Sequence, residues 1–214
     1  MNITASPMPT QIKWHDVNLG DIEYPVHTIM VTGSREFDDL RQVHDILARY
    51  AEIHAQDYPD IPLVLVSGHA QRGADVLAEM IWPDFGPTAT EPAQWDVHTP
   101  GRCKCADDPT ATYCRLAGIV RNEKMVNDYK PSVVVVFYEP IAENCGTNHA
   151  AEYARSKDIP VRTVIAQPKA SLASNDSQPV VDTPVAPVDA TDPLDFYVTS
   201  TPLWLCPKGA GRRL

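Results

Sequence analysis

Short runs of apolar, largely β-branched residues alternate with longer amphipathic segments along most of the chain. The runs are typical of strands that are buried on both faces, and they cover 28–32, 63–67, 132–138 and 161–165. The segments between them predict helices over about 40–51, 73–82, 113–129 and 148–157, with Asp38 or Asp39 capping the first. A further strand is expected at 94–98. This alternation predicts an α/β fold, a Rossmann-like parallel sheet with helices on both faces.

The sequence divides into four parts of different character. Residues 1–25 are mixed and proline-containing, which is typical of an extended N-terminal arm, and 26–167 form the Rossmann-like domain. Residues 168–195 are rich in Pro and Asp and contain too few apolar residues to order themselves, so we expect a disordered linker. The last part, 196–214, regains aromatic and basic residues. It is either a peptide that docks on a protein partner or a disordered tail with incidental aromatics.

Bulk composition narrows the range of functions. The 214 residues carry 18 Lys and Arg against 28 Asp and Glu, a formal net charge of −10, which argues against a nucleic-acid partner. No apolar run approaches the roughly 20 residues of a membrane span, and we expect no export signal and no membrane association. The count of five cysteines is odd. Together these features favour a reduced, cytoplasmic protein.

Three glycine-containing turns precede predicted helices, at 31–35, 66–75 and 145–148. A strand, a glycine turn and a helix in succession direct free backbone N–H groups toward an anion. We therefore expect these turns to converge on one nucleotide phosphate, together with residues of the 113–129 helix. The ligand-binding residues predicted in this way are Gly33, Ser34, Arg35, Ser67, Gly68, Gly73, Asp75, Arg121, Asn122, Gly146, Thr147 and Asn148.

Some of these residues also have a purely structural interpretation. A glycine after a strand serves an ordinary tight turn, and a loop arginine is often only solvated. Asp75 is a favourable charge at a helix N-terminus, an acceptor for a ribose hydroxyl, or a group that orients Arg121. Because Arg121 stands among apolar neighbours, its charge needs a partner, either a ligand phosphate or an internal carboxylate.

The order of the motifs resembles that of the SLOG superfamily, named for the SMF/DprA and LOG proteins, and in particular its YspA, or cpYpsA-related, branch. The resemblance spans 28–165. Its motifs are 31–37, 67–75, 117–118 with 121–125, and 133–137 followed by 146–147. The resemblance implies a Rossmann-like fold that binds nucleotides or nucleotide-derived ligands. Some members hydrolyse the N-glycosidic bond of a nucleoside monophosphate, while others bind DNA or are thought to sense nucleotide signals. A homodimer is implied in the same way.

The match to the hydrolases of this superfamily is incomplete. Their Arg-Lys-x-x-Met motif corresponds to 121–125, which places Arg121 at the position of their catalytic arginine. Their Gly-Thr-x-Glu turn corresponds to 146–149, where His149 replaces the glutamate, and the preceding Pro-Gly-Gly is absent. In a hydrolase, a carboxylate would have to stabilise the positive charge that develops at the anomeric carbon. The catalytic residues predicted for this case are Arg121, Asp75 and Glu139, with Glu79 and Glu143 as further substitutes for the missing carboxylate.

A cysteine-containing stretch precedes the 113–129 helix. His98, Cys103, Cys105 and Cys114 follow one another as His-x4-Cys-x-Cys-x8-Cys. Four nitrogen and sulfur ligands could hold a structural zinc ion. The spacing lacks the usual Cys-x2-Cys pair, however, and favours free thiols on a loop.

The sequence therefore predicts a module that binds a nucleotide or nucleotide-derived ligand for sensing or signalling, without a required cofactor. The alternative is hydrolysis of the N-glycosidic bond of a nucleoside monophosphate or an NAD-like dinucleotide. DNA binding of the DprA kind is disfavoured by the net charge of −10.

Overall fold

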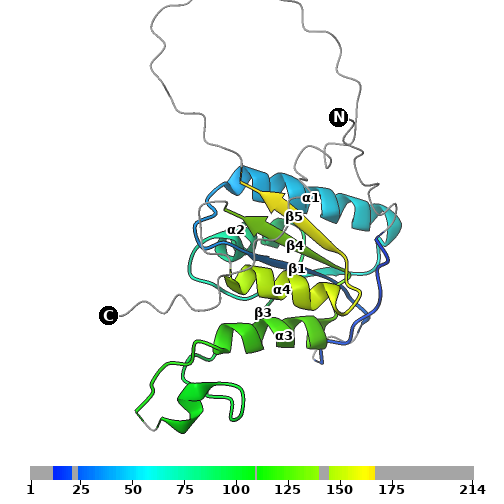
Figure 1. The fold of residues 1–214 in the computed structure, drawn as a ribbon. Coiled ribbons are helices and arrows are strands. Elements are labelled where there is room, and N and C mark those ends of the chain that lie inside the picture. The colour runs from blue at the N-terminus through cyan, green and yellow to red at the C-terminus, as the bar shows by residue number, and fades with distance from the viewer. Residues whose placement is uncertain (1–11, 21–23, 109, 140–144, 167–214) are drawn as a thin grey trace, which may run out of the picture.

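A computed structural model describes residues 12–20, 24–108, 110–139 and 145–166 of the chain. Within these residues, five strands form one parallel sheet in the order β3-β2-β1-β4-β5 (Figure 1). The strands are β1 (His27–Gly33), β2 (Leu63–Ser67), β3 (Thr88–Thr90), β4 (Val133–Tyr138) and β5 (Val161–Ile165), and the α-helices are α1 (Leu40–Asp57), α2 (Ala74–Ile81), α3 (Ala117–Tyr129) and α4 (Cys145–Arg155). The predicted α/β, Rossmann-like architecture is confirmed.

The two faces of the sheet are covered by different pairs of helices (Figure 1). On one face, side chains of α1 and α2 such as Leu47 and Ala78 pack with Ile29 and Val135 of the strands. On the other, Met125 and side chains of α4 pack with alternate residues of the same strands. Because β1, β2 and β4 are buried on both sides, their sequences are apolar almost throughout, as the sequence pattern indicated.

The ends of the helices follow local sequence signals in two cases. Asp39 caps α1, and its side chain accepts a hydrogen bond from the backbone N–H of Gln42 at 2.9 Å. After α3, Lys130 adopts a left-handed conformation with φ of 42°, and Pro131 follows it. Such a residue closes a helix and turns the chain toward the next strand.

The expectation of a strand at 94–98 is wrong, because the third strand is the shorter segment Thr88–Thr90. It pairs with β2 at the edge of the sheet, where its side chains are largely exposed and leave little hydrophobic signal. The apolar residues at 95 and 97 that suggested a strand have other environments. The ring of Trp95 stacks on Tyr113 with centroids 5.1 Å apart, and Val97 is 51% exposed.

The described part of the N-terminal arm lies against the domain. Val17 and Val26 form an antiparallel bridge, and Trp14 is buried beside the rings of His27 and His54. The linker and C-terminal peptide predicted at 168–195 and 196–214 lie outside the described residues. Among the helices of the described segments, none is both long and apolar enough to cross a membrane.

Candidate functional site

The carboxyl ends of the central strands meet at one edge of the sheet. Gly33 at the end of β1 is in register with Phe137 of β4, and Val31 is in register with Ser67 of β2. The strand order changes direction between β1 and β4, since β2 and β3 lie on one side of β1 and β4 and β5 on the other. Open α/β sheets bind ligands in the crevice outside the strand ends at such a switch point.

Gly33 and Gly73 allow α2 to pack closely on β1. A Cβ atom on Gly33 would lie 2.5 Å from the Ala74 Cβ and 2.6 Å from the Phe137 carbonyl oxygen. Gly73 has a φ of 85°, and a Cβ there would lie 2.5 Å from the Cα of Arg35. The two glycines therefore have a structural role that does not depend on a ligand.

The polar groups of the first turn are largely occupied within the protein. The backbone N–H of Ser34 donates to the Phe137 carbonyl at 2.8 Å, and its hydroxyl donates to Glu36 at 2.9 Å. Arg35 is exposed, and its charge acts on Asp75 and Arg121. Ser34 is thus less available to an anion than the sequence suggested, whereas Arg35 has the exposure that a ligand contact needs.

Arg121 links the second glycine turn to α3. Its Nη1 donates to the carbonyl oxygen of Gly68, and its Nε donates to the Asn122 side-chain oxygen at 2.8 Å. A Cβ on Gly68 would overlap this guanidinium, so only glycine admits the arginine at this place. The hydroxyl of Ser67, at the start of the turn, accepts the backbone N–H of His69 at 3.3 Å.

Asn122 extends this connection to the start of α4. It is 2% exposed, and its Nδ2 donates to the carbonyl oxygen of Gly146 at 3.0 Å. The contacts from Gly68 through Arg121 and Asn122 to Gly146 therefore join three of the motifs that the sequence singled out. These residues lie up to 78 positions apart, from 68 to 146 along the chain, and they meet because their strands end at one edge.

Asp75 is buried beside this arginine. Asp75 is 5% exposed, and its Oδ2 accepts a hydrogen bond from the backbone N–H of Ala70 at 3.4 Å. Burial raises the pKa of Asp75 to about 6, although the positive charge of Arg121 acts in the opposite direction. Burial likewise lowers the pKa of Arg121, and the charge of Asp75 opposes that change. The predicted association of Asp75 with Arg121 thus takes the form of an electrostatic interaction.

Helix α4 begins at Cys145, three residues before the predicted start at Asn148. Gly146 and Thr147 consequently belong to the first turn of the helix and not to a turn that precedes it. The backbone N–H groups of a first helical turn have no acceptor within the helix and favour anions. A Cβ on Gly146 would meet no atom within 4 Å, and Thr147 is 6% exposed. The hydroxyl of Tyr138 donates to the side-chain oxygen of Asn148.

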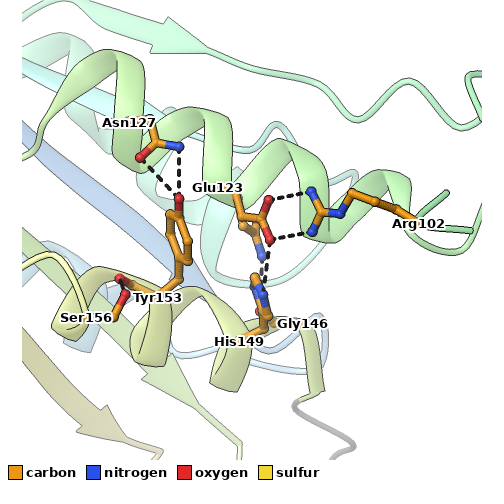
Figure 2. Close-up of polar contacts among 8 residues, drawn as sticks. Arg102, Glu123, Asn127, Gly146, His149, Tyr153 and Ser156 are labelled. Carbon is orange, nitrogen blue, oxygen red and sulfur yellow. Dashed lines mark hydrogen bonds and ion pairs between the residues drawn. The ribbon is translucent and has the colours of Figure 1, made fainter. Parts of the chain in front are cut away.

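A carboxylate that the sequence reasoning missed lies beside His149. Glu123 of α3 accepts two hydrogen bonds from Arg102, at 2.7 and 2.8 Å, and its Oε1 lies 3.5 Å from Nε2 of His149 (Figure 2). The hydrogen bonds from Arg102 lower the pKa of Glu123, despite partial burial. The sequence did contain a signal for Glu123, because this residue lies within the 121–125 motif, two positions from Arg121 on the same helix.

The other candidate carboxylates have different surroundings. The Oε2 of Glu79, on α2, lies 2.8 Å from the Nδ1 of His69. Glu139 directly follows β4 at the carboxyl edge and is half-buried. Glu143 lies outside the described residues. Of the three catalytic residues predicted for a hydrolase, Arg121 and Asp75 interact electrostatically, and Glu139 lies at the same edge of the sheet.

A second cluster forms in the segment between β3 and α3. The ligand atoms of His98, Cys103, Cys105 and Cys114 all lie within 4.8 Å of one another, and the three cysteines form no disulfide. The four residues that the sequence proposed as metal ligands are thus brought together in a cluster that could hold a metal ion. The segment that carries them extends beyond the N-terminal end of α3 (Figure 1).

A cavity of about 600 Å³ lies at the opposite edge of the sheet, near the amino ends of β4 and β5. Its lining includes Lys13, His15, Lys130 and Lys157. Helices α3 and α4 end near this cavity. None of the predicted phosphate-binding residues lines this cavity. The candidate site is therefore the one at the carboxyl edge of the sheet.

A scan against models of protein families and a search of curated proteins both find no match to this sequence.

Proposed function

We propose that this chain binds a nucleotide-derived ligand at the carboxyl edge of β1, β2 and β4. The observation that carries the proposal is the series of contacts from Gly68 through Arg121 and Asn122 to Gly146. It holds a half-buried guanidinium close to the first turn of α4, at the switch point of the sheet. The resemblance to the SLOG superfamily supports the same interpretation.

The charge and the donors of this edge suit a phosphate group. Arg121 uses its Nε and Nη1 within the protein, and among the described residues its Nη2 makes no hydrogen bond. A guanidinium offers five N–H donors in a planar fork, so donors remain for a phosphate. The N–H groups of the first turn of α4 would complete the site, with Gly146 leaving open space for the ligand.

Hydrolysis of an N-glycosidic bond is the second candidate. It is favoured by Asp75, because a buried carboxyl with a pKa of about 6 can exchange a proton near neutral pH. In this reaction, Arg121 would bind the phosphate, and Asp75 or Glu139 would stabilise the developing positive charge. The exchange of the family's glutamate for His149 is the reason why binding alone remains our first proposal. The nearby Glu123 is already paired with Arg102, so it could take the place of that glutamate only by giving up its two hydrogen bonds with Arg102.

Calorimetric titration with AMP, NAD and ADP-ribose tests the proposal, and chromatography of the same mixtures detects free base. We expect binding of at least one ligand and at least a tenfold loss of affinity in Arg121→Gln, since a charge-assisted hydrogen bond contributes about 1.5–3 kcal/mol. Arg41→Gln, which makes the same substitution on the exposed side of α1, is the matched control. Base release that Arg121→Gln abolishes would favour the hydrolase, whereas no binding of any of the three at millimolar concentration would contradict both functions.

Several predictions made from the sequence accompany this proposal. We expect a cytoplasmic location from the odd number of cysteines and a homodimer from the resemblance to the SLOG superfamily. The peptide at 196–214 either docks on a protein partner or is a disordered tail. We also expect that binding uses protein groups alone and requires no cofactor.

A further inference from the structure

We propose that His98, Cys103, Cys105 and Cys114 bind one Zn²⁺ ion in a closed tetrahedral site, which fixes the segment between β3 and α3. The four side chains come from three separate points of this segment and converge on one volume. The Nδ1 of His98 lies 3.1 Å from the sulfur of Cys105. This inference does not depend on nucleotide binding.

The histidine is oriented as a metal ligand. Its Nε2 lies 3.0 Å from the carbonyl oxygen of Ala111, which can only accept a hydrogen bond. The hydrogen bond therefore places the proton on Nε2 and leaves the lone pair of Nδ1 directed toward the thiols. A hydrogen bond from the distal ring nitrogen to a carbonyl is the arrangement that commonly supports a zinc-bound histidine.

The ligand set and its dimensions favour zinc. Three thiolates and one imidazole form a Cys3His set, which is typical of four-coordinate structural zinc, whereas iron–sulfur clusters usually take four thiolates. Metal–sulfur bonds of about 2.3 Å in a tetrahedron place the ligand atoms roughly 3.8 Å apart. The separations of up to 4.8 Å need only a small contraction to reach this geometry. On binding, the three thiols would release their protons to the solvent.

The segment between β3 and α3 has little regular secondary structure and few buried apolar side chains among its described residues. Its described residues contain one short 3-10 turn, Lys104–Asp107, and Cys114 is the one apolar side chain between 91 and 116 that is fully buried. Such a segment gains little from hydrophobic burial, and metal binding can provide the missing stability. Cys114 lies just before the start of α3, so the ion would connect the segment to that helix.

One consequence concerns Arg102, which lies between His98 and Cys103 in the sequence. Its guanidinium holds Glu123 of α3, and Glu123 lies beside His149 of α4 (Figure 2). An ion bound by the flanking residues restricts the backbone that carries Arg102. The metal would therefore stabilise the contact between this segment and both helices.

Metal analysis of the full chain, purified under reducing conditions without chelators, tests the proposal. We expect close to one equivalent of zinc per chain, and at least a tenfold lower content in Cys105→Ser and in His98→Asn. Cys206→Ser is the matched control, because the proposed ligand set does not use this cysteine, and its replacement should leave the zinc content unchanged. Iron in place of zinc, or a disulfide among the three cysteines under reducing conditions, would overturn the proposal.

Two measurements on the wild-type chain remain decisive if a variant fails to fold. Cobalt added to the metal-free protein should give the visible absorption bands of tetrahedral, thiolate-bound Co²⁺. Trypsin should cleave after the exposed Arg102 and Lys104 at least tenfold faster once a chelator has removed the metal. Absence of the cobalt bands, or cleavage at the same rate with and without the chelator, would contradict a metal that orders this segment.

Discussion

The buried carboxyl of Asp75 makes the stability of the protein depend on pH in a direction that can be measured. Its pKa rises from 3.8 to about 6 because of burial, and the charge of Arg121 only partly opposes the rise. Between these two values, the folded chain binds more protons than the unfolded chain. The contribution of Asp75 to stability is therefore fully present below pH 4 and is lost as the pH rises through 6.

The size of the effect follows from the two pKa values. One pKa unit corresponds to about 1.4 kcal/mol, so the difference of about two units predicts a loss of about 3 kcal/mol between pH 4 and pH 7. Urea unfolding at a series of pH values measures the free energy of unfolding of the wild type and of Asp75→Asn. In the difference between the two free energies of unfolding, the contributions of the other titrating groups cancel. This difference, wild type minus Asp75→Asn, should fall by about 3 kcal/mol between pH 4 and pH 7.

The control for this experiment is Asp60→Asn, which changes an exposed carboxylate before β2. Its profile should run parallel to that of the wild type. A difference between wild type and Asp75→Asn that stays constant within about 0.5 kcal/mol would refute the reasoning, because Asp75 would then titrate alike in the folded and unfolded chains. The same titration bears on the proposed function. Because a neutral Asp75 leaves Arg121 free for an anion, the affinity for ADP-ribose should increase as the pH falls through 6.

Three further predictions follow from other contacts. Gly73→Ala should destabilise the fold by about 1–3 kcal/mol, because the φ of Gly73 is 85° and a Cβ there would meet the backbone. Gly146→Ala should leave the stability unchanged or increase it, because a Cβ there meets no atom within 4 Å and alanine favours a helix. Chemical unfolding measures both variants, and equal losses of stability would contradict this account. Burial lowers the pKa of His54 to about 4, so below pH 6.5 the unfolded chain binds a proton more readily than the folded chain. The free energy of unfolding of the wild type should therefore fall by about 3 kcal/mol between pH 6.5 and pH 4 relative to that of His54→Phe. Profiles of stability against pH that run parallel for the two proteins would contradict this prediction. Arg102→Ala should raise the pKa of Glu123 toward its ordinary value, as carboxyl NMR would detect, while an unchanged pKa would show that Arg102 is not its cause.

The fold could be predicted because its central strands carry an unambiguous signal. The runs at 63–67 and 132–138 are apolar at almost every position, and only a strand covered on both faces explains this. The edge strand Thr88–Thr90 gave no such signal, because it is short and exposed. The alternation of Trp95 and Val97 imitated a strand, although Trp95 stacks on another ring.

The start of α4 was misplaced for a related reason. Gly146 has a low helix propensity, so local preference favoured a turn there. In the structure, the residue lies in the first turn of α4 and accepts a hydrogen bond from Asn122, which is 24 positions away. A contact over that distance is not encoded in the local pattern. The pairing of Arg102 with Glu123 escaped prediction for the same reason, because an irregular segment carries one partner.

The candidate site could be predicted in outline and not in its details. The motif order placed Gly68, Arg121 and Gly146 at one edge, and the structure brings them together through hydrogen bonds. The sequence could not indicate that Ser34 would bond within its own turn, or that Gly33 would serve the packing of α2. These outcomes depend on the distance between backbone segments, which is set by the packing of the whole sheet.

The most direct test of the central claim is the affinity for ADP-ribose in Gly68→Ala. The three atoms nearest to the new methyl group all belong to the guanidinium at the flexible end of Arg121, so we expect the guanidinium to move while the backbone stays in place. Calorimetric titration should show at least a tenfold weaker affinity than that of the wild type, with the free energy of unfolding changed by less than about 2 kcal/mol. Unchanged affinity for ADP-ribose in a folded Gly68→Ala would contradict a phosphate site built around Arg121.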